Sequence, residues 1–435
     1  MGNFTRRILP ATSIIISSLL LQGCIRFDAE QELAVYPDSM MSVERIQVVS
    51  RPEAPSAVFA SFGYRSNIDI YTTEGDDLFT QLSSIERDGI ITTFEASVSP
   101  EPVPGPSDLR REIAVLEFSL DETEGTLSLH REDDLGEYQE EASVTLDWSF
   151  DFAVFGSVIR TDQNNDGIEE FSVFVSGSSY GPSDATLLFA EYTLDRSTGD
   201  FSEVFLIEAP GVAANYTIGR THLVAGFETG DLDGDDLIDS VMVLSPLSFP
   251  GTSSRFEVTL AGAGASPPIS IEGPAEFIQS VELVDVDGNG NLDLLVSANS
   301  LYLYRDIGVN ENPAGETIFS VDDLPVEEFP SSLSIQWTGA ADLDLDGDID
   351  FVSVTSRGIL TVEQRDNNGN KYFGSPAFVD QISRFYRAGA LGQLSTDLKP
   401  DLVYPGDNYP MSEDTFILWR KNISRKRTPP TPNPV

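Results

Sequence analysis

Short apolar runs rich in β-branched residues recur along the chain, and several of them follow directly on a strongly acidic turn. Four such runs read "EFSVFV", "DSVMVLS", "DLLVSA" and "DFVSVTS". Brief runs of this composition, bounded by turn residues, predict β-strands rather than helices. We therefore expect each acidic turn to be the tip of a hairpin, with a strand on either side.

The acidic turns share one nine-residue spacing. They read "DQNNDGIEE" at 162–170, "DLDGDDLID" at 231–239, "DVDGNGNLD" at 285–293 and "DLDLDGDID" at 342–350. Oxygen-bearing side chains fill positions 1, 3, 5 and 9 of every copy: Asp162, Asn164, Asp166, Glu170; Asp231, Asp233, Asp235, Asp239; Asp285, Asp287, Asn289, Asp293; Asp342, Asp344, Asp346, Asp350. A fifth copy, 393–401, keeps only Asp397 and Asp401 as charged positions.

The interval between copies predicts the architecture. Their first positions lie about 58 residues apart on average, which is room for about four short strands. A four-stranded unit repeated at this period is typical of a β-propeller blade. Residues 46–423 hold six or seven such units, and we favour seven. Two blades without an acidic turn are then expected around 60–72 and 111–130, and the strand at 44–50 is a candidate for completing the last blade.

The charge of the chain restricts its partners. It carries 71 acidic and 26 basic residues, for a formal net charge of -45, which repels nucleic acids. Two histidines and a single cysteine provide no material for a zinc cluster or a disulfide framework. A bound metal ion is therefore expected to have oxygen ligands.

The acidic turns predict calcium sites. Four carboxylates within a few ångströms repel one another by on the order of 1 kcal/mol per pair, so a cation is expected among them. Calcium accepts about six to eight oxygens in flexible geometry, and extracellular sites bind it at about 0.1–1 mM. Position 6, where the chain must bend sharply, is Gly167, Gly290 or Gly347 in three copies. We predict four structural Ca²⁺ ions.

An EF-hand is excluded as the source of this pattern. That motif requires a bidentate glutamate at position 12 of its loop. The residues at position 12 here are Val173, Met242, Val296 and Ser353, and strands rather than helices are predicted beside each loop.

The N-terminus predicts export and lipidation. Residues 1–23 combine Arg6 and Arg7 with an apolar stretch from Ile8 to Leu21, as in a secretory signal peptide. Leu21 to Cys24 resembles the lipobox of bacterial lipoproteins, which implies acylation of Cys24 and anchoring in a membrane. Because Ile25 rather than aspartate follows, we expect a cell-envelope protein at the outer membrane, facing the periplasm or the cell surface.

The repeats resemble a known family. "TGDLDGDDLIDSVMVL", "VDVDGNGNLDLLVSANSLYLYRD" and "ADLDLDGDIDFVSVTSRGILTVE" are similar to the FG-GAP or VCBS repeats of integrin α-subunit heads and many bacterial surface proteins. The resemblance covers about 155–420. It implies a seven-bladed propeller whose aspartate loops join the two inner strands of a blade and bind calcium, used mainly for adhesion or protein contact.

These features give a domain plan. We expect a signal peptide at 1–23, a lipidated tether at 24–45, the propeller at 46–423 and a basic, proline-rich, disordered tail at 424–435.

The function expected from this plan is a non-catalytic binding or adhesion module for a protein or glycan ligand, and not an enzyme. No nucleophile elbow, phosphate-binding loop or dinucleotide motif occurs, and His130 and His222 are interpreted as structural. The alternative is a surface hydrolase or lyase that acts on polysaccharide or other polymers. That alternative predicts clustered carboxylates with shifted pKa values outside the aspartate loops. The residues that line the central funnel discriminate between the two hypotheses.

Overall fold

The structure is a computed structural model that describes the chain from Gln31 to Ser424 with interruptions. The residues outside the description are 1–30, 37–42, 52–53, 63–65, 74–78, 99–109, 121–122, 149–151, 162–168, 179–184, 197, 211–221, 233–237, 247–251, 261–268, 308–325, 330–333, 356–357, 368–369, 382–387, 395–398, 408–414, 423 and 425–435. Cys24, the predicted signal peptide and nearly all of the predicted tail lie outside the described residues. Among those described, no helix is long and apolar enough to span a bilayer.

The described residues form seven four-stranded antiparallel sheets, which we number as blades in chain order. Blade 1 contains β2 (Val43–Arg51), β3 (Ala54–Phe62), β4 (Asn67–Thr73) and β5 (Phe79–Glu86). Blade 2 contains β6 (Ile90–Val98), β7 (Arg111–Phe118), β8 (Glu124–Glu132) and β9 (Tyr138–Asp147). Blade 3 contains β10 (Phe152–Thr161), β11 (Glu170–Ser178), β12 (Ala185–Asp195) and β13 (Asp200–Pro210). Blade 4 contains β14 (His222–Gly230), β15 (Asp239–Pro246), β16 (Arg255–Thr259) and β17 (Ile269–Glu272).

The remaining blades follow the same plan, with two variations. Blade 5 contains β18 (Ser280–Val284), β19 (Asp293–Ser297), β20 (Leu301–Tyr304) and β21 (Val326–Phe329). Blade 6 contains β22 (Ile335–Ala341), β23 (Asp350–Thr355), β24 (Gly358–Val362) and β27 (Ala377–Gln381), with the hairpin of β25 (Gln364–Asn367) and β26 (Asn370–Phe373) inserted before its last strand. Blade 7 contains β28 (Ala390–Gly392), β29 (Asp401–Asp407), β30 (Thr415–Arg420) and β1 (Gln31–Tyr36).

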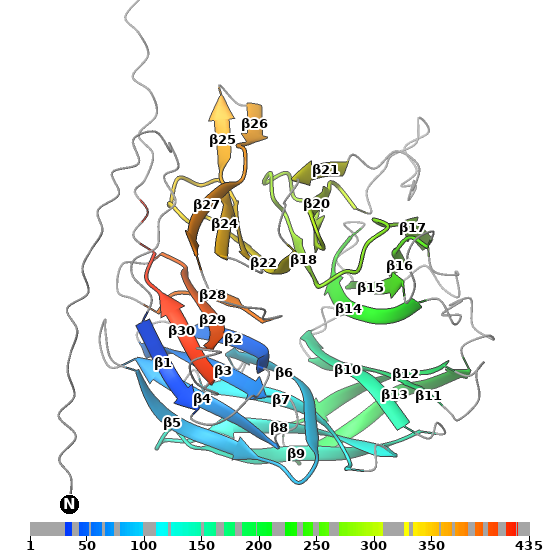
Figure 1. The fold of residues 1–435 in the computed structure, drawn as a ribbon. Coiled ribbons are helices and arrows are strands. Elements are labelled where there is room, and N and C mark those ends of the chain that lie inside the picture. The colour runs from blue at the N-terminus through cyan, green and yellow to red at the C-terminus, as the bar shows by residue number, and fades with distance from the viewer. Residues whose placement is uncertain are drawn as a thin grey trace, which may run out of the picture.

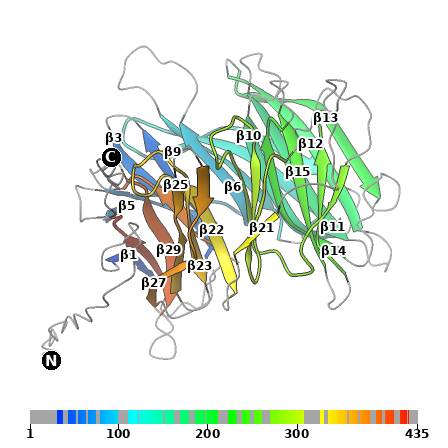
Figure 2. The same ribbon diagram turned by 90° about the horizontal axis from the view of Figure 1, so that it is seen from above.

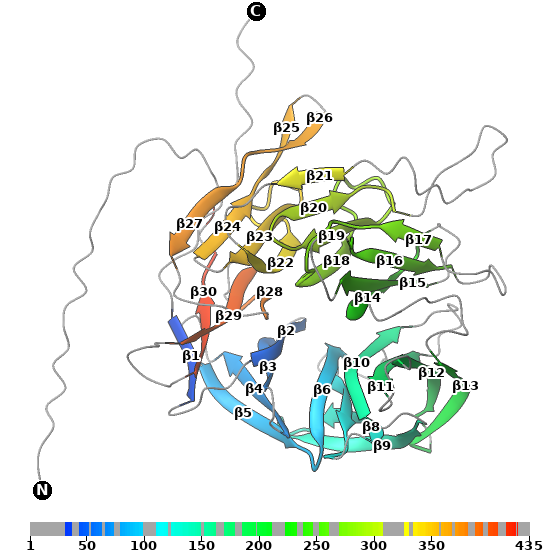
Figure 3. The ribbon, with the colours of Figure 1, turned by 45° about the vertical axis from the view of Figure 1, so that its right-hand side comes forward.

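The blades are arranged in a closed ring (Figures 1 and 3). The first strand of each blade contacts the first strand of the next, from β2 through β28 and back to β2. These seven strands are therefore the innermost layer. The prediction of an all-β propeller with four-stranded blades is confirmed, and the seven described sheets agree with the favoured count. Blades without an aspartate loop also lie where they were expected, at β3–β4 and β7–β8.

The ring is closed by a strand that the sequence analysis did not identify. β1 pairs with β30, from Gln31 opposite Trp419 to Tyr36 opposite Thr415. Figures 1 and 3 show β1 beside β30, and Figure 2 shows the ring from above. The interpretation of 44–50 as the closing strand is wrong, because those residues form the innermost strand of blade 1. The range predicted as a tether, 24–45, thus contains a strand of blade 7.

The hydrophobic core lies between blades rather than within one blade. Six clusters of buried side chains each join two neighbouring blades, as Leu116 of blade 2 and Phe171 of blade 3 do in one of them. At the junction of blades 3 and 4, Phe174 and Phe227 stack with ring centroids 5.7 Å apart. This arrangement explains why the second strands are almost continuously apolar: β19 and β23 are buried along their whole length because both of their faces are covered.

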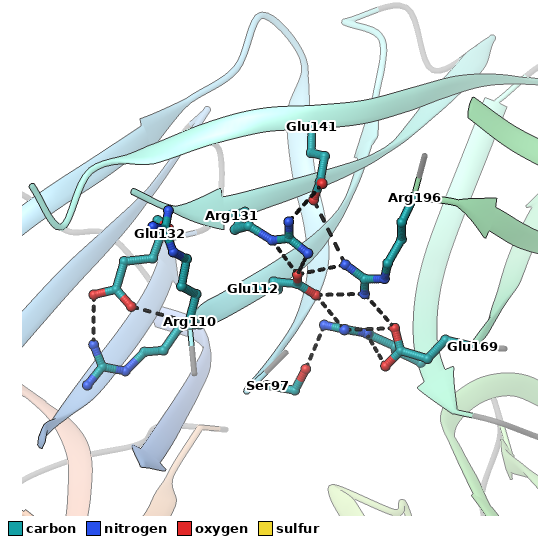
Figure 4. A network of polar contacts seen from close by, with 10 residues as sticks. Ser97, Arg110, Glu112, Arg131, Glu132, Glu141, Glu169 and Arg196 are labelled. Carbon is teal, nitrogen blue, oxygen red and sulfur yellow. Dashed lines mark hydrogen bonds and ion pairs between the residues drawn. The ribbon is translucent and has the colours of Figure 1, made fainter. Parts of the chain in front are cut away.

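Blades 2 and 3 are also joined by a buried network of charges (Figure 4). The carboxylate of Glu112 on β7 is fully buried and accepts hydrogen bonds from Arg131 at 2.7 Å and Arg196 at 2.8 Å. Arg160 on β10 donates to the second oxygen at 2.5 Å and also pairs with Glu169. Burial alone would raise the pKa of Glu112, but the hydrogen bond from Arg196 and the nearby arginine charges lower it to about 2.

Candidate functional site

The predicted aspartate loops occupy equivalent places in blades 3 to 6. Each joins the first strand of its blade to the second, as the family resemblance implied. The loops at 285–293 and 342–350 are described in full. Of the other two loops, Asp162, Asn164, Asp166, Asp233 and Asp235 lie outside the described residues. Glu170 and Asp239 are buried at the start of their strands, and Asp231 is partly buried.

Position 1 of each fully described loop holds the turn together. Both oxygens of Asp285 accept backbone N–H groups, from Gly288 at 2.8 Å and Gly290 at 2.9 Å. Asp342 accepts N–H groups from Asp346 at 3.0 Å and Gly347 at 2.9 Å. Gly290 and Gly347 have φ values of 93° and 97°, which explains the glycine at position 6.

Positions 1, 3 and 9 converge in both fully described loops. In Asp285, Asp287 and Asp293, and likewise in Asp342, Asp344 and Asp350, one carboxylate oxygen per residue lies within 4.8 Å of the others. Position 5 has a different role, since Asn289 accepts the N–H of Asn291 at 2.7 Å and Asp346 accepts that of Asp348 at 3.0 Å. The structure therefore brings together three of the four predicted ligands in each of these two loops.

Asp344 is the residue that most clearly fits a cation. Its side chain is 1% exposed, and neither carboxylate oxygen has a hydrogen-bond partner among the described residues. Burial and the neighbouring charges of Asp346, Glu363 and Asp342 raise its pKa to about 6. A buried carboxylate without donors is costly unless a cation neutralises it, so this donor set fits a hard ion such as Ca²⁺.

The equivalent residue in blade 5 is different. Asp287 forms an ion pair with Arg305 at 3.1 Å, and Arg305 also lies 5.7 Å from the ring centroid of Phe373. A protein cation thus approaches this loop from the same blade. The two loops share a spacing in sequence but differ in how much of their charge is balanced internally.

Position 9 has a structural role that the sequence analysis missed. Asp239, Asp293, Asp350 and Asp401 each accept the backbone N–H of position 2, at 2.8, 3.0, 3.2 and 3.1 Å. In the last three the second oxygen accepts an N–H beyond the third strand, from Asp306, Gln364 or Asn422. The aspartate at position 9 therefore connects the loop to the segment after the third strand of the same blade. The fifth copy, 393–401, keeps this connection although it has lost most of its acidic positions.

A second group of carboxylates lies on the innermost strands, outside the aspartate loops. Glu95 on β6 pairs with Arg45 on β2 at 2.8 Å, and the same oxygen accepts a hydrogen bond from Gln47 at 2.8 Å. Glu228 lies on β14 and Glu282 on β18. We call Arg45, Gln47, Glu95, Glu228 and Glu282 the axial cluster.

Electrostatic coupling places this cluster across the centre of the ring. Glu228 of blade 4 is influenced by the charges of Arg45 in blade 1 and Glu95 in blade 2, which are not its neighbours around the ring. Glu282 of blade 5 is influenced by Glu228. All five side chains are partly exposed, so solvent reaches them.

The pKa values of two axial glutamates are shifted strongly upward. Burial and the charge of Glu95, opposed by Arg45, raise the pKa of Glu228 to about 7. Burial and the charge of Glu228 raise the pKa of Glu282 to about 8, against a hydrogen bond from the backbone of Ala340. Such a pair holds at least one proton near neutral pH, which is what acid catalysis requires.

The sequence contained a signal for this pair that we did not use. Glu228 and Glu282 each lie three residues before the first aspartate of a loop, in consecutive repeats. Equivalent positions in adjacent blades of a propeller face the same axis, so two charged residues there meet. The corresponding residue of blade 6 is Gly339.

His130 is structural, as expected. Its side chain is 4% exposed, and Nε2 lies 3.1 Å from the hydroxyl of Ser128. Burial and the charge of Arg87 lower its pKa to about 4, so the ring is neutral at physiological pH. The side chain of His222 is outside the described part of the chain.

No protein-family model and no curated protein matches this chain. Among solved structures, it resembles Saccharomyces cerevisiae Sqt1 with 10% identity and a TM-score of 0.47, over 90% of this chain and 99% of that one. It also resembles a mutant α-L-arabinofuranosidase of Fusarium graminearum with 8% identity and a TM-score of 0.46, over 76% and 93% of the two chains. A Penicillium chrysogenum α-L-arabinanase matches with 12% identity and a TM-score of 0.44, over 76% and 94%.

Two of these three proteins are named as enzymes, whereas we predicted a non-catalytic binding or adhesion module that is not an enzyme. At identities of 8 to 12% and TM-scores below 0.5, these likenesses transfer no substrate or catalytic residue and carry no argument of their own. The axial cluster is the feature that the alternative predicted, namely carboxylates with shifted pKa values outside the loops. The prediction of a non-catalytic module is therefore corrected.

Proposed function

We propose that this protein is a glycoside hydrolase that cleaves polysaccharide at the centre of its propeller. One observation carries the proposal: Glu228 and Glu282 occupy equivalent positions on adjacent innermost strands, and both have pKa values raised into the neutral range. Carboxyl pairs with separated roles, one protonated and one ionised, are the usual machinery for hydrolysing a glycosidic bond.

Glu282 is assigned as the general acid, since its pKa of about 8 keeps it protonated at neutral pH. It would donate its proton to the glycosidic oxygen as the bond to the anomeric carbon breaks. Glu228, once ionised, would take a proton from the water that supplies the new hydroxyl group, so that the reaction consumes one water and leaves the pair's proton count unchanged. Arg45 and Gln47 hold Glu95 beside this pair.

The proposal predicts a bell-shaped dependence of kcat/KM on pH, with limbs near 7 and 8. The two limbs belong to the coupled pair, because each carboxylate influences the other. Glu228→Gln removes the proposed base, so the reduced activity that remains should lose the acidic limb. It also removes a negative charge that raises the pKa of Glu282 and should shift the basic limb to lower pH. Glu282→Gln should reduce kcat by about 100-fold or more, since the proton donor is lost.

Reducing-end release from soluble arabinan, xylan and mixed-linkage β-glucan measures this activity. Glu203→Gln, a change on β13 of blade 3 far from the axial cluster, is the matched control and should retain wild-type rates. If purified wild-type protein releases no sugar from any polysaccharide, or if Glu282→Gln is as active as wild type, the assignment fails.

We further propose that Ca²⁺ stabilises the aspartate loops. The support is the unpartnered, buried carboxylate of Asp344 and the convergence of positions 1, 3 and 9 in blades 5 and 6. Asp342, Asp344 and Asp350 would hold the ion in blade 6, and Asp285, Asp287 and Asp293 in blade 5. Calcium would neutralise these carboxylates and fix each hairpin tip. The spacing extends the proposal to the loops of blades 3 and 4.

We also propose that the protein is a lipoprotein of the bacterial envelope whose repeats are of the FG-GAP/VCBS type. The lipobox-like sequence before Cys24 and the spacing of the loops support this. Labelling of cells with a palmitate analogue tests the anchor. The wild-type protein should take up label, and Cys24→Ala should not.

A further inference from the structure

A cavity of about 390 Å³ opens between blades 1 and 2, away from the axial cluster. Blade 1 contributes Thr72 of β4 and Leu82 of β5, and blade 2 contributes Arg110 and the turn between β8 and β9. Because strands alternate in direction within a blade, turns from third to fourth strands lie at the same end as the aspartate loops. The cavity therefore opens on the loop face, in the two blades that lack an aspartate loop. Its volume suits one small ligand group.

The floor of the cavity is fixed by buried ion pairing. Arg111 is 2% exposed and donates to Glu132 through its backbone N–H and through its guanidinium, both at 3.2 Å. Its other guanidinium nitrogen donates to the carbonyl of Pro55 in blade 1. Both terminal guanidinium nitrogens of Arg111 are thus used internally and hold the two blades in register, while its buried Nε has no partner among the described residues. The cavity is preformed rather than created by a ligand.

The turn that forms one wall is also fixed. Asp133 accepts the backbone N–H groups of Leu135 at 2.8 Å and Glu137 at 2.9 Å. Gly136 has a φ of 82°, and a Cβ atom there would lie 3.1 Å from the side chain of Leu82 across the cavity. This turn therefore presents Asp134 and Leu135 in a defined position.

The groups left for a ligand are one donor, one acceptor and an apolar edge. Arg110 pairs with Asp134 at the rim, where the Asp134 side chain is 89% exposed and the Arg110 side chain 34% exposed. An exposed pair of this kind contributes little stability and can exchange partners readily. Leu135 is 81% exposed and faces the cavity together with Leu82.

This combination suits a sugar with neighbouring hydroxyl groups. One hydroxyl can donate to Asp134 while the next accepts from Arg110, and the C–H face of the ring can contact Leu82 and Leu135. An anionic ligand is disfavoured, since two arginines and three acidic residues line the cavity and the whole chain carries -45.

We propose that this cavity is an accessory carbohydrate site that binds a neutral saccharide unit of a polymer. The proposal rests on the function proposed above, because the accessory site would retain a polysaccharide whose cleavage occurs at the axial cluster. Binding and cleavage use different residues and are measured separately.

The test uses the full chain and soluble neutral polysaccharides, namely arabinan, xylan and β-glucan, in affinity gel electrophoresis and titration calorimetry. Leu135→Ala and Asp134→Ala should each weaken binding of the retained polymer by at least fivefold. Leu120→Ala is the matched control, since Leu120 is a 75% exposed leucine in the same blade, in the turn between β7 and β8 at the other end of the strands. It should bind as wild type does.

Cleavage distinguishes this site from the axial cluster. Leu135→Ala should raise KM for the polymer and leave kcat unchanged, whereas Glu282→Gln should lose kcat and still bind. The inference is overturned if no neutral polysaccharide is retained, if Leu135→Ala and Asp134→Ala bind as tightly as wild type, or if only acidic polymers bind. Retention that depends on Leu135 without cleavage would support this site while refuting the hydrolase.

Discussion

Leu345, at position 4 of the blade 6 loop, has a φ of 60°, a conformation that side chains with a Cβ atom disfavour. Gly288 holds the same position in blade 5 with a φ of 72°, and Gly234 holds it in the blade 4 sequence. The blade 6 loop therefore places a leucine, 37% exposed, where the loops of blades 4 and 5 have glycine and the blade 3 sequence has Asn165. The left-handed conformation costs a leucine about 1 kcal/mol.

Replacing this leucine with a residue that tolerates the conformation should stabilise the protein. Asparagine adopts a left-handed backbone more readily than leucine and avoids the entropic cost of glycine. We expect Leu345→Asn to increase the free energy of unfolding by roughly 0.5–1 kcal/mol, measured by urea denaturation at saturating Ca²⁺. Leu120→Asn, at an exposed leucine without a positive φ, should bring no gain. Equal gains in both variants would contradict the strain argument.

At the scale of the element, the aspartate loop combines two functions that substitution can separate. The aspartate at position 9 accepts backbone hydrogen bonds from position 2 and from beyond the third strand, and we call these two bonds the position 9 brace. Positions 1 and 3 converge with position 9 on the proposed ion. The fifth copy keeps the brace in Asp401 and has lost most of the charged positions. The fifth copy therefore has the position 9 brace but lacks the full set of predicted calcium ligands.

Substitutions at Asp344 and Asp401 should consequently differ in their response to calcium. Asp344→Asn should reduce the increase in Tm that Ca²⁺ gives over a chelator, because one ligand charge is lost. Asp401→Ala should lower stability by about 2–4 kcal/mol, because two buried N–H groups lose their acceptor. Differential scanning calorimetry with and without Ca²⁺ measures both effects.

The calcium response of the Asp401→Ala variant is the control. Its Tm should rise with Ca²⁺ by as much as that of the wild type, since the metal-binding loops are intact. If wild-type Tm does not change on chelation, the calcium proposal fails, but the structural role of Asp401 is unaffected.

At the scale of the whole molecule, the buried carboxylate of Glu112 and the partly exposed carboxylate of Glu282 have opposite effects on the pH dependence of stability. Glu112 joins blades 2 and 3 and has a pKa lowered to about 2, so its contribution is present above the ordinary value near 4.5 and is lost as pH falls toward 2. Glu282 has a pKa raised to about 8, so the folded state is favoured below 4.5 and loses that advantage as pH rises through 8.

Substitution of each glutamate should remove its own part of the pH profile. In the wild type, Tm should fall between pH 5 and pH 8 as Glu282 loses its proton. In Glu282→Gln this fall in Tm should be smaller. Glu112→Gln should weaken the junction of blades 2 and 3 by about 3–5 kcal/mol at neutral pH and flatten the fall in stability between pH 4.5 and 2. Thermal unfolding across this pH range, at saturating Ca²⁺, measures both. If Tm of Glu282→Gln falls between pH 5 and 8 as steeply as that of the wild type, the raised pKa of Glu282 is contradicted.

The sequence by itself determined the local and periodic features of this protein. The spacing of Asp342, Asp344 and Asp350 identified a turn with convergent carboxylates, and the interval between copies identified four-stranded blades. These features can be predicted from sequence because hairpins are formed by residues close in the chain, and because each repeat shows the same pattern of residues. The apolar runs after the acidic turns likewise predicted the second strands of the blades.

Tertiary structure decided which distant residues meet. Ring closure brought β1 to β30, which no local signal specifies because strand pairing across the two ends depends on the curvature of the whole ring. The same closure placed Arg45 and Glu95 near Glu228, although 183 and 133 positions separate them from it in the chain. The repeat pattern could have shown that Glu228 and Glu282 occupy equivalent positions. Their raised pKa values and the approach of Arg45 and Glu95 depend on burial and on neighbouring charges in space, so only the fold could show them.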